Sequence, residues 1–180
     1  FNLLILNPPQ SPFKKREAKN KMRLKEKIII PALFFSVTFF IAPPIVLAQI
    51  VINEIMYDLA GADDKHEWVE LYNNGSSPVD LTDYKFIDGD TATNHALNTP
   101  PKNNSRGSMI IYAGGYALLA GDAATLITDL PNYTGTIIDT VLTLSNTNAT
   151  LKLLDNNGIE EATTAYNKEM GSAGNSRTLE

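Results

Sequence analysis

The stretch HEWVELYNNG, residues 66–75, combines one of the two histidines of the chain, its single tryptophan and two glutamates three positions apart. Alternate side chains of a β-strand share a face, so Glu67 and Glu70 would point to opposite sides of a sheet. They therefore cannot act as a carboxylate pair on one substrate. Val69 and Leu71 share the face that has no charge between them, and the pattern predicts that they point into a core.

The outer face of the same strand carries Trp68, Glu70 and Tyr72, which are the candidate binding residues. We expect any binding chemistry near this strand to involve that face or the acidic loop that precedes it. His66, at the strand entrance, is interpreted as a solvated surface histidine, and a ligand role is the alternative.

The loop before this strand holds four acidic residues that are candidate calcium ligands: Asp58, Asp63, Asp64 and Glu67. Calcium is bound by oxygen ligands from loops of this composition, although the spacing does not match the EF-hand pattern. The alternative is a solvated turn that keeps an exposed strand edge from pairing. Calcium is the one possible cofactor that the sequence indicates.

Composition narrows the classes of function. The 180 residues include no cysteine, which excludes disulfides, thiolate zinc sites and a cysteine nucleophile. Residues 49–180 carry 7 Lys/Arg and 18 Asp/Glu, a net charge of 7 − 18 = −11. This acidic character argues against direct binding of nucleic acid. With two histidines far apart and no cysteine, the sequence predicts that the protein is not an enzyme.

The first 48 residues have the features of a targeting sequence. A basic start at Met22, an apolar run, Pro43-Pro44 and a Val-Leu-Ala ending predict a signal peptide over residues 22–48, cleaved before Gln49. The alternative is an uncleaved membrane anchor, the only way in which we expect a membrane contact. Residues 1–21 are interpreted as upstream or leader sequence without a role in the fold. We therefore expect a secreted, extracellular or cell-surface protein.

The rest of the chain alternates short apolar runs with turn signals. The runs predict strands over residues 50–57, 66–73, 84–87, 108–113, 116–121, 136–144, 149–155 and 159–166, with a further short edge strand around residues 95–97. No helix able to connect strands is expected, so the pattern predicts an all-β fold, either an antiparallel sandwich or a small barrel. Asn157-Gly158 and Gly114-Gly115 predict two tight hairpins, the first with both residues in left-handed conformation.

The predicted core follows from the alternation within these runs. It consists of the following residues: Ile52, Ile55, Val69, Leu71, Leu81, Phe86, Ile110, Leu118, Leu142, Leu151 and Leu153.

Several segments, taken in order, resemble the bacterial version of the lamin tail domain. They are INEIMYD, EWVELYNNGSSPVDLTDYKF, MIIYAGGYALLAGD and LSNTNATLKLLDNNGIEEATTAY. The resemblance implies an immunoglobulin-like antiparallel β-sandwich over residues 49–168. Residues 169–180 are then a C-terminal extension, in which GNSRTLE departs from the family's usual continuation and which we expect to be truncated.

The same resemblance implies a non-catalytic interaction or structural module of a larger protein. Its expected partner is a protein or a cell-surface polymer. Two alternatives stay open, namely an accessory targeting domain of a secreted hydrolase or nuclease, and a calcium-dependent adhesion module.

Overall fold

The computed structural model describes residues 49–63, 65–89 and 93–180. The predicted leader (1–21) and signal peptide (22–48) lie outside these residues, and so does the choice between cleavage and anchoring. Within the described ranges, no helix has the length and apolar character needed to cross a membrane.

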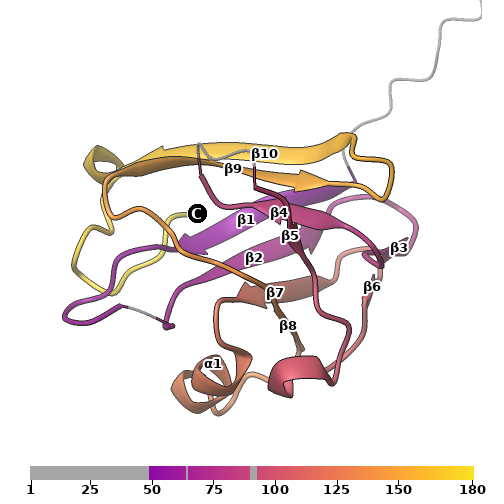
Figure 1. Ribbon diagram of the computed structural model, residues 1–180, viewed down its shortest axis with the longest axis horizontal. Coiled ribbons are helices and arrows are strands. Elements are labelled where there is room, and N and C mark those ends of the chain that lie inside the picture. The colour runs from indigo at the N-terminus through magenta and orange to yellow at the C-terminus, as the bar shows by residue number, and fades with distance from the viewer. Residues whose placement is uncertain (1–48, 64, 90–92) are drawn as a thin grey trace, which may run out of the picture. The chain divides into compact units, whose positions relative to one another are not determined.

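Two four-stranded sheets form the body of the domain (Figure 1). The first has the order β1-β2-β7-β8, with β1 at Ile50–Met56, β2 at Trp68–Asn73, β7 at Tyr116–Ala120 and β8 at Thr136–Asp139. The second has the order β10-β9-β4-β5, with β10 at Glu160–Asn167, β9 at Asn148–Leu154, β4 at Lys85–Ile87 and β5 at His95–Ala96. A short third sheet pairs β3 (Val79–Asp80) with β6 (Ile110–Ile111).

The main core lies between the two large sheets. One continuous apolar cluster takes residues from both of them, including Val69 and Leu71 of β2, Phe86 of β4 and Leu151 of β9. Because a strand alternates inward and outward residues, β2 and β9 contribute every second position to this cluster, whereas an irregularity between Ile52 and Glu54 shifts the alternation in β1. All sheet pairs are antiparallel except β7 with β8. The all-β, immunoglobulin-like sandwich predicted from the sequence is confirmed.

The expectation that no helix connects strands is wrong. Helix α1 (Ala123–Asp129) joins β7 to β8, which run parallel. Parallel neighbours require a crossover connection, and this helix supplies it in two turns. A seven-residue helix is too short to produce a sustained helical period in the sequence. A second apolar cluster forms beneath it on the outer face of the first sheet, from Leu118, Ala120, Ala123, Leu126 and Ile137.

One of the two predicted hairpins is confirmed. The chain turns between β9 and β10. There the amide of Gly158 donates to the carbonyl of Asp155 at 3.0 Å, and the amide of Asp155 donates to the carbonyl of Ile159 at 2.8 Å. Gly158 has a φ of 78°, whereas Asn157 does not adopt positive φ. At Gly114 the chain also turns, but β6 pairs with β3 and β7 pairs with β2, so these two strands separate into different sheets. The second prediction of a hairpin is therefore wrong.

The predicted core is mostly correct, with three departures. Ile110 is 40% exposed and Ile111 is 3% exposed, so β6 faces the opposite way from the prediction. Leu118 is buried, but it belongs to the cluster under α1. Ile52 is only partly buried at the edge of the main core.

The C-terminal segment folds back on the sandwich. After a short 3₁₀ turn, η2 (Lys168–Met170), it reaches β1, where Leu179 forms an isolated antiparallel bridge with Ile55. Its side chain packs against the main core.

Candidate functional site

The inward face of β2 is as predicted, and two polar residues, one just before the strand and one at its end, hold neighbouring segments in place. Val69 and Leu71 are fully buried. Glu67 is also buried, and its Oε2 accepts a hydrogen bond from the backbone amide of Leu144 at 2.9 Å. Asn73 donates through Nδ2 to the carbonyl of Ile111 at 2.8 Å. Glu67 and Asn73 therefore tie the segment of Leu144 and strand β6 to the two ends of β2.

On the outer face of β2, Trp68 is covered by the helix that the sequence did not predict. It packs against the cluster under α1, together with Ile127, Leu130 and Tyr133. A partly buried tryptophan in this position closes the apolar layer between sheet and helix. The structure shows that Trp68 packs in this layer. The role of Trp68 in binding stays a prediction.

Glu70 and Tyr72, the other two candidates on this face, have partners within the domain. Oε1 of Glu70 accepts a hydrogen bond from Nδ2 of Asn53 at 2.8 Å. Burial raises the pKa of Glu70, and the nearby Glu54 carboxylate adds to the rise while the bond from Asn53 opposes it. Tyr72 stacks on Tyr116 of the neighbouring strand, with ring centroids 4.7 Å apart. The three predicted binding residues thus share one face, as the alternation requires.

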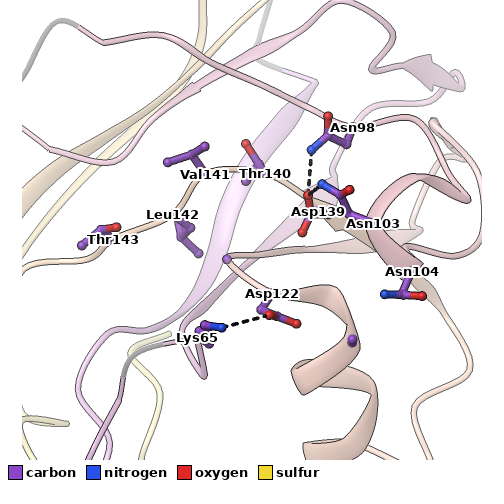
Figure 2. A pocket seen from close by; sticks show the side chains of 12 residues that line it. Lys65, Asn98, Asn103, Asn104, Asp122, Asp139, Thr140, Val141, Leu142 and Thr143 are labelled. Atoms are coloured by element: carbon purple, nitrogen blue, oxygen red, sulfur yellow. Dashed lines mark hydrogen bonds and ion pairs between the residues drawn. The ribbon is translucent and has the colours of Figure 1, made fainter.

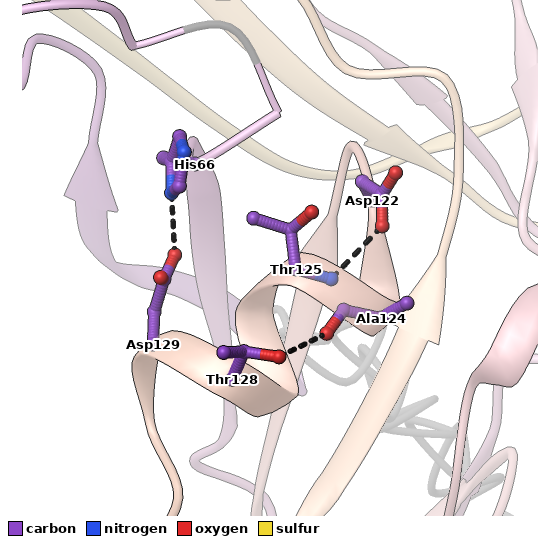
Figure 3. A network of polar contacts seen from close by, with 6 residues as sticks. All are labelled: His66, Asp122, Ala124, Thr125, Thr128 and Asp129. Carbon is purple, nitrogen blue, oxygen red and sulfur yellow. Dashed lines mark hydrogen bonds and ion pairs between the residues drawn. The ribbon is translucent and has the colours of Figure 1, made fainter.

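His66 links the entrance of β2 to the end of α1 (Figure 3). Its Nδ1 lies 2.6 Å from Oδ2 of Asp129. The interpretation of this residue as a merely solvated histidine is therefore incomplete, because it holds the helix to the loop before β2.

The predicted calcium ligands are only partly brought together. Nδ2 of Asn146 donates to Asp63 at 2.7 Å and to Asp58 at 3.4 Å, so an amide lies between these two carboxylates. Glu67 instead points to Leu144, and Asp64 lies outside the described residues. Among the residues that the structure does describe, no three His, Cys, Asp or Glu side chains are grouped so that they could hold a metal. Calcium binding stays a prediction.

A polar cleft that the sequence reasoning missed lies between α1 and the end of β8 (Figure 2). It has a volume of about 580 Å³. Four segments line it: Lys65, the loop holding Asn98, Asn103 and Asn104, the start of α1 from Gly121 to Ala124, and residues 139–143. Amide, carboxylate and hydroxyl groups therefore predominate on its walls.

Asp139, the last residue of β8, fixes the geometry of the cleft. It is only 7% exposed, and its Oδ1 accepts hydrogen bonds from Nδ2 of Asn98 and Nδ2 of Asn103, each at 2.7 Å. The backbone amide of Asn98 also donates to the carbonyl of Asp139 at 2.9 Å. A buried carboxylate needs such donors. They hold the loop of Asn98 and Asn103 against the sheet.

Asp122 forms the opposite wall and begins helix α1. Its Oδ1 accepts a hydrogen bond from the backbone amide of Thr125 at 2.9 Å, an N-cap that satisfies a free helix amide (Figure 3). This bond, assisted by Lys65, whose Nζ lies 3.9 Å away, holds the pKa of Asp122 below its usual value. The wall therefore places a hydrogen-bonded carboxylate beside the exposed ammonium group of Lys65.

This arrangement is suited to binding. The amides, carboxylates and hydroxyls of the residues that line the cleft can exchange hydrogen bonds with hydroxyl, amide or ammonium groups of a ligand. An aspartate ending an apolar run, as in TIID, was the sequence signal that could have pointed to Asp139.

Comparison with known families agrees with the fold. The family model described as Lamin Tail Domain matches residues 45–168. No curated protein matches the chain. The match covers most of the chain, including all ten strands within the residues that the structure describes. The chain therefore belongs to the lamin tail domain family.

Proposed function

We propose that this domain is a non-enzymatic interaction module, secreted or held at the cell surface, that binds a hydroxyl-rich polymer in the cleft beside Asp139. The immunoglobulin-like fold supports a binding role, because such domains typically present ligand sites on loops over a rigid sandwich. The order of basic, apolar and small residues within 22–48 supports export.

The observation that carries this proposal is the fixed polar wall of the cleft. Asn98 and Asn103 use their amide groups to hold Asp139, which leaves their carbonyl oxygens oriented by the same bonds. Preorganised donors and acceptors reduce the entropy cost of binding a polar ligand. A saccharide, which offers hydroxyl groups that both donate and accept, fits such a wall. The same binding role would serve an accessory targeting domain of a secreted hydrolase or nuclease.

The test is a pull-down of the protein with insoluble peptidoglycan, chitin and cellulose. Val141, 59% exposed, lines the cleft, and Val141→Arg would fill it with a long side chain. Ile159→Arg is the matched control, because Ile159 is 64% exposed in the turn between β9 and β10 and lies outside the cleft lining. Both variants should melt like the wild type, since neither residue is buried.

We expect retention on at least one polymer, loss of about tenfold or more in affinity for Val141→Arg, and no change for Ile159→Arg. Failure of all three polymers to retain the protein would contradict the proposed ligand class. Equal binding by both variants would contradict the cleft as the site. Release of soluble sugar from the bound polymer would contradict a non-enzymatic role.

A further inference from the structure

Gln49 lies just before β1, and its backbone is hydrogen-bonded at both ends. Its nitrogen donates to Oε1 of Glu161 at 2.8 Å, and its carbonyl accepts a hydrogen bond from the amide of Asn74 at 2.8 Å. The amide of Ile50 donates to the same Oε1 at 3.4 Å. These bonds hold the backbone nitrogen of Gln49 within hydrogen-bond distance of a carboxylate.

An irregularity in β10 places this carboxylate. The register of β10 against β9 shifts between Glu160 and Ala162, so Glu161 has no partner residue on β9. A shift of this kind redirects the side chain of the extra residue. The carboxylate of Glu161 reaches the first residue of β1, a strand of the other large sheet. The pairing of β10 therefore directs Glu161 to the start of β1.

The surroundings of Glu161 are negatively charged. Its side chain is half-buried, and among the residues that the structure describes it forms no ion pair with a lysine, arginine or histidine. Burial raises the pKa of the nearby Tyr84, and the charges of Glu161, Asp155 and Asp80 add to the rise. A positive charge beside Glu161 would therefore be stabilised by the carboxylate that it meets.

Removal of the predicted leader would create such a charge at Gln49. The sequence predicts that a signal peptidase cuts the chain between Ala48 and Gln49. Hydrolysis adds one water to this peptide bond, so that Ala48 keeps a carboxylate and the nitrogen of Gln49 becomes an ammonium group at neutral pH. This is the nitrogen that donates to Glu161. A hydrogen bond with one charged partner thus becomes an ion pair with two.

We infer that Glu161 is the binding site for the α-ammonium group that leader removal creates at Gln49, so that processing of the leader stabilises the folded domain. The ligand of this site is the amino terminus of the processed chain itself. The inference rests on the export that is part of the proposed function. It assigns a role to a residue that does not line the cleft beside Asp139.

The test compares the full chain before and after cleavage at Gln49, in the same detergent. Val46→Glu, Leu47→Gly and Ala48→Arg create the sequence Ile-Glu-Gly-Arg, after which factor Xa cuts. Mass spectrometry checks that Gln49 is the first residue and has a free amine. We expect cleavage to raise the melting temperature by about 2–4 °C at neutral pH. The rise should be lost at pH about 10, because the ammonium group has then released its proton.

Three altered proteins show whether the rise comes from this ion pair. Glu161→Gln keeps an acceptor for the two backbone amides but removes the charge, so cleavage should change its melting temperature little. Glu160→Gln is the matched control at the neighbouring residue, which pairs with Lys152, and it should keep the full rise. One glycine inserted before Gln49 places the same ammonium group one residue away, so this protein should lose the rise.

The inference would be overturned by the absence of a rise in the parent protein, or by an equal rise in Glu161→Gln or after the glycine insertion. In a bacterial host, the exported chain should begin at Gln49 with a free amine. A chain that keeps its leader inside the cell would contradict the proposed export and this inference together, whereas an exported chain with another or a cyclised first residue would overturn the inference alone. The polymer pull-down tests the cleft, so its outcome is independent of the melting experiment.

Discussion

Leu71 is fully buried on the inward face of β2, at the centre of the main core. Leu71→Ala should lower the free energy of unfolding by about 2–5 kcal/mol, because it leaves a cavity that neighbouring side chains fill only in part. Urea unfolding measures the loss. Val141→Ala, at an exposed apolar position, is the control and should change stability little. Similar losses for the two variants would contradict the assigned face of β2.

Glu70 should make stability depend on pH in a predictable direction. Its pKa is raised in the folded protein, chiefly by burial, so the native state holds its proton more tightly than the unfolded chain does. Its contribution to stability is therefore present below the ordinary glutamate pKa and is lost as pH rises through the raised value. Glu70→Gln should be more stable than wild type at pH 7, and the difference should shrink in acid. The measurement is urea unfolding of both proteins across a pH series. A difference in their stability that does not change with pH would contradict this prediction.

At the scale of elements, α1 depends on its N-cap. Asp122→Ala should cost about 1 kcal/mol, because the amide of Thr125 loses its partner. Asp122→Asn keeps an acceptor and is the matched control. The lowered pKa of Asp122 means that its contribution is present above the ordinary aspartate pKa and is lost as pH falls through the lowered value. In acid the wild type should therefore lose stability relative to Asp122→Asn, as thermal melting would detect.

The turn between β9 and β10 requires glycine at one position. Gly158 has a φ of 78°, a conformation that costs other residues about 1–2 kcal/mol, so Gly158→Ala should be destabilised by that amount. Gly89→Ala is the control, since an added Cβ there meets no atom within 4 Å and its φ is ordinary. Equal melting temperatures for the two variants would contradict the turn geometry.

These two elements also show which features of the fold can be predicted from the sequence. The Asn157-Gly158 turn was predictable, because a local pair of residues determines it. Helix α1 was not predicted, because seven residues give too few apolar repeats, although Asp122 before Ala123 was an available capping signal. The reversed face of β6 follows from its length, since two residues carry no alternation to read.

At the scale of the whole molecule, residues 49–180 carry a strongly negative charge, which attracts divalent cations such as calcium. If the loop of Asp58 and Asp63 binds calcium, calorimetry with the ion at millimolar concentration should give heat and a higher melting temperature. Magnesium is the control, because it prefers a smaller and more rigid site. Absence of both effects with calcium would dispose of the site.

The cleft could not be predicted from the sequence, because segments that lie far apart in the chain form it. The alternation within residues 66–75 predicted correctly which side chains of β2 are buried, since it depends on one strand. Lys65, Asn98, Asp122 and Asp139 come from four distant segments, and only the crossover through α1 and the packing of the Asn98 loop bring them together. Residues that are neighbours in space but distant in the sequence produce no local sequence pattern.

The two apolar clusters lie on opposite faces of the same sheet, and β7 contributes to both: Leu119 to the main core and Leu118 to the cluster under α1. With β2 and β8 on either side, β7 is also paired along both edges. Water can reach its amides only when both layers separate, so β7 should be among the last strands to exchange its amide hydrogens. The most stable part of this domain therefore lies off the midplane of the sandwich, on the side of helix α1.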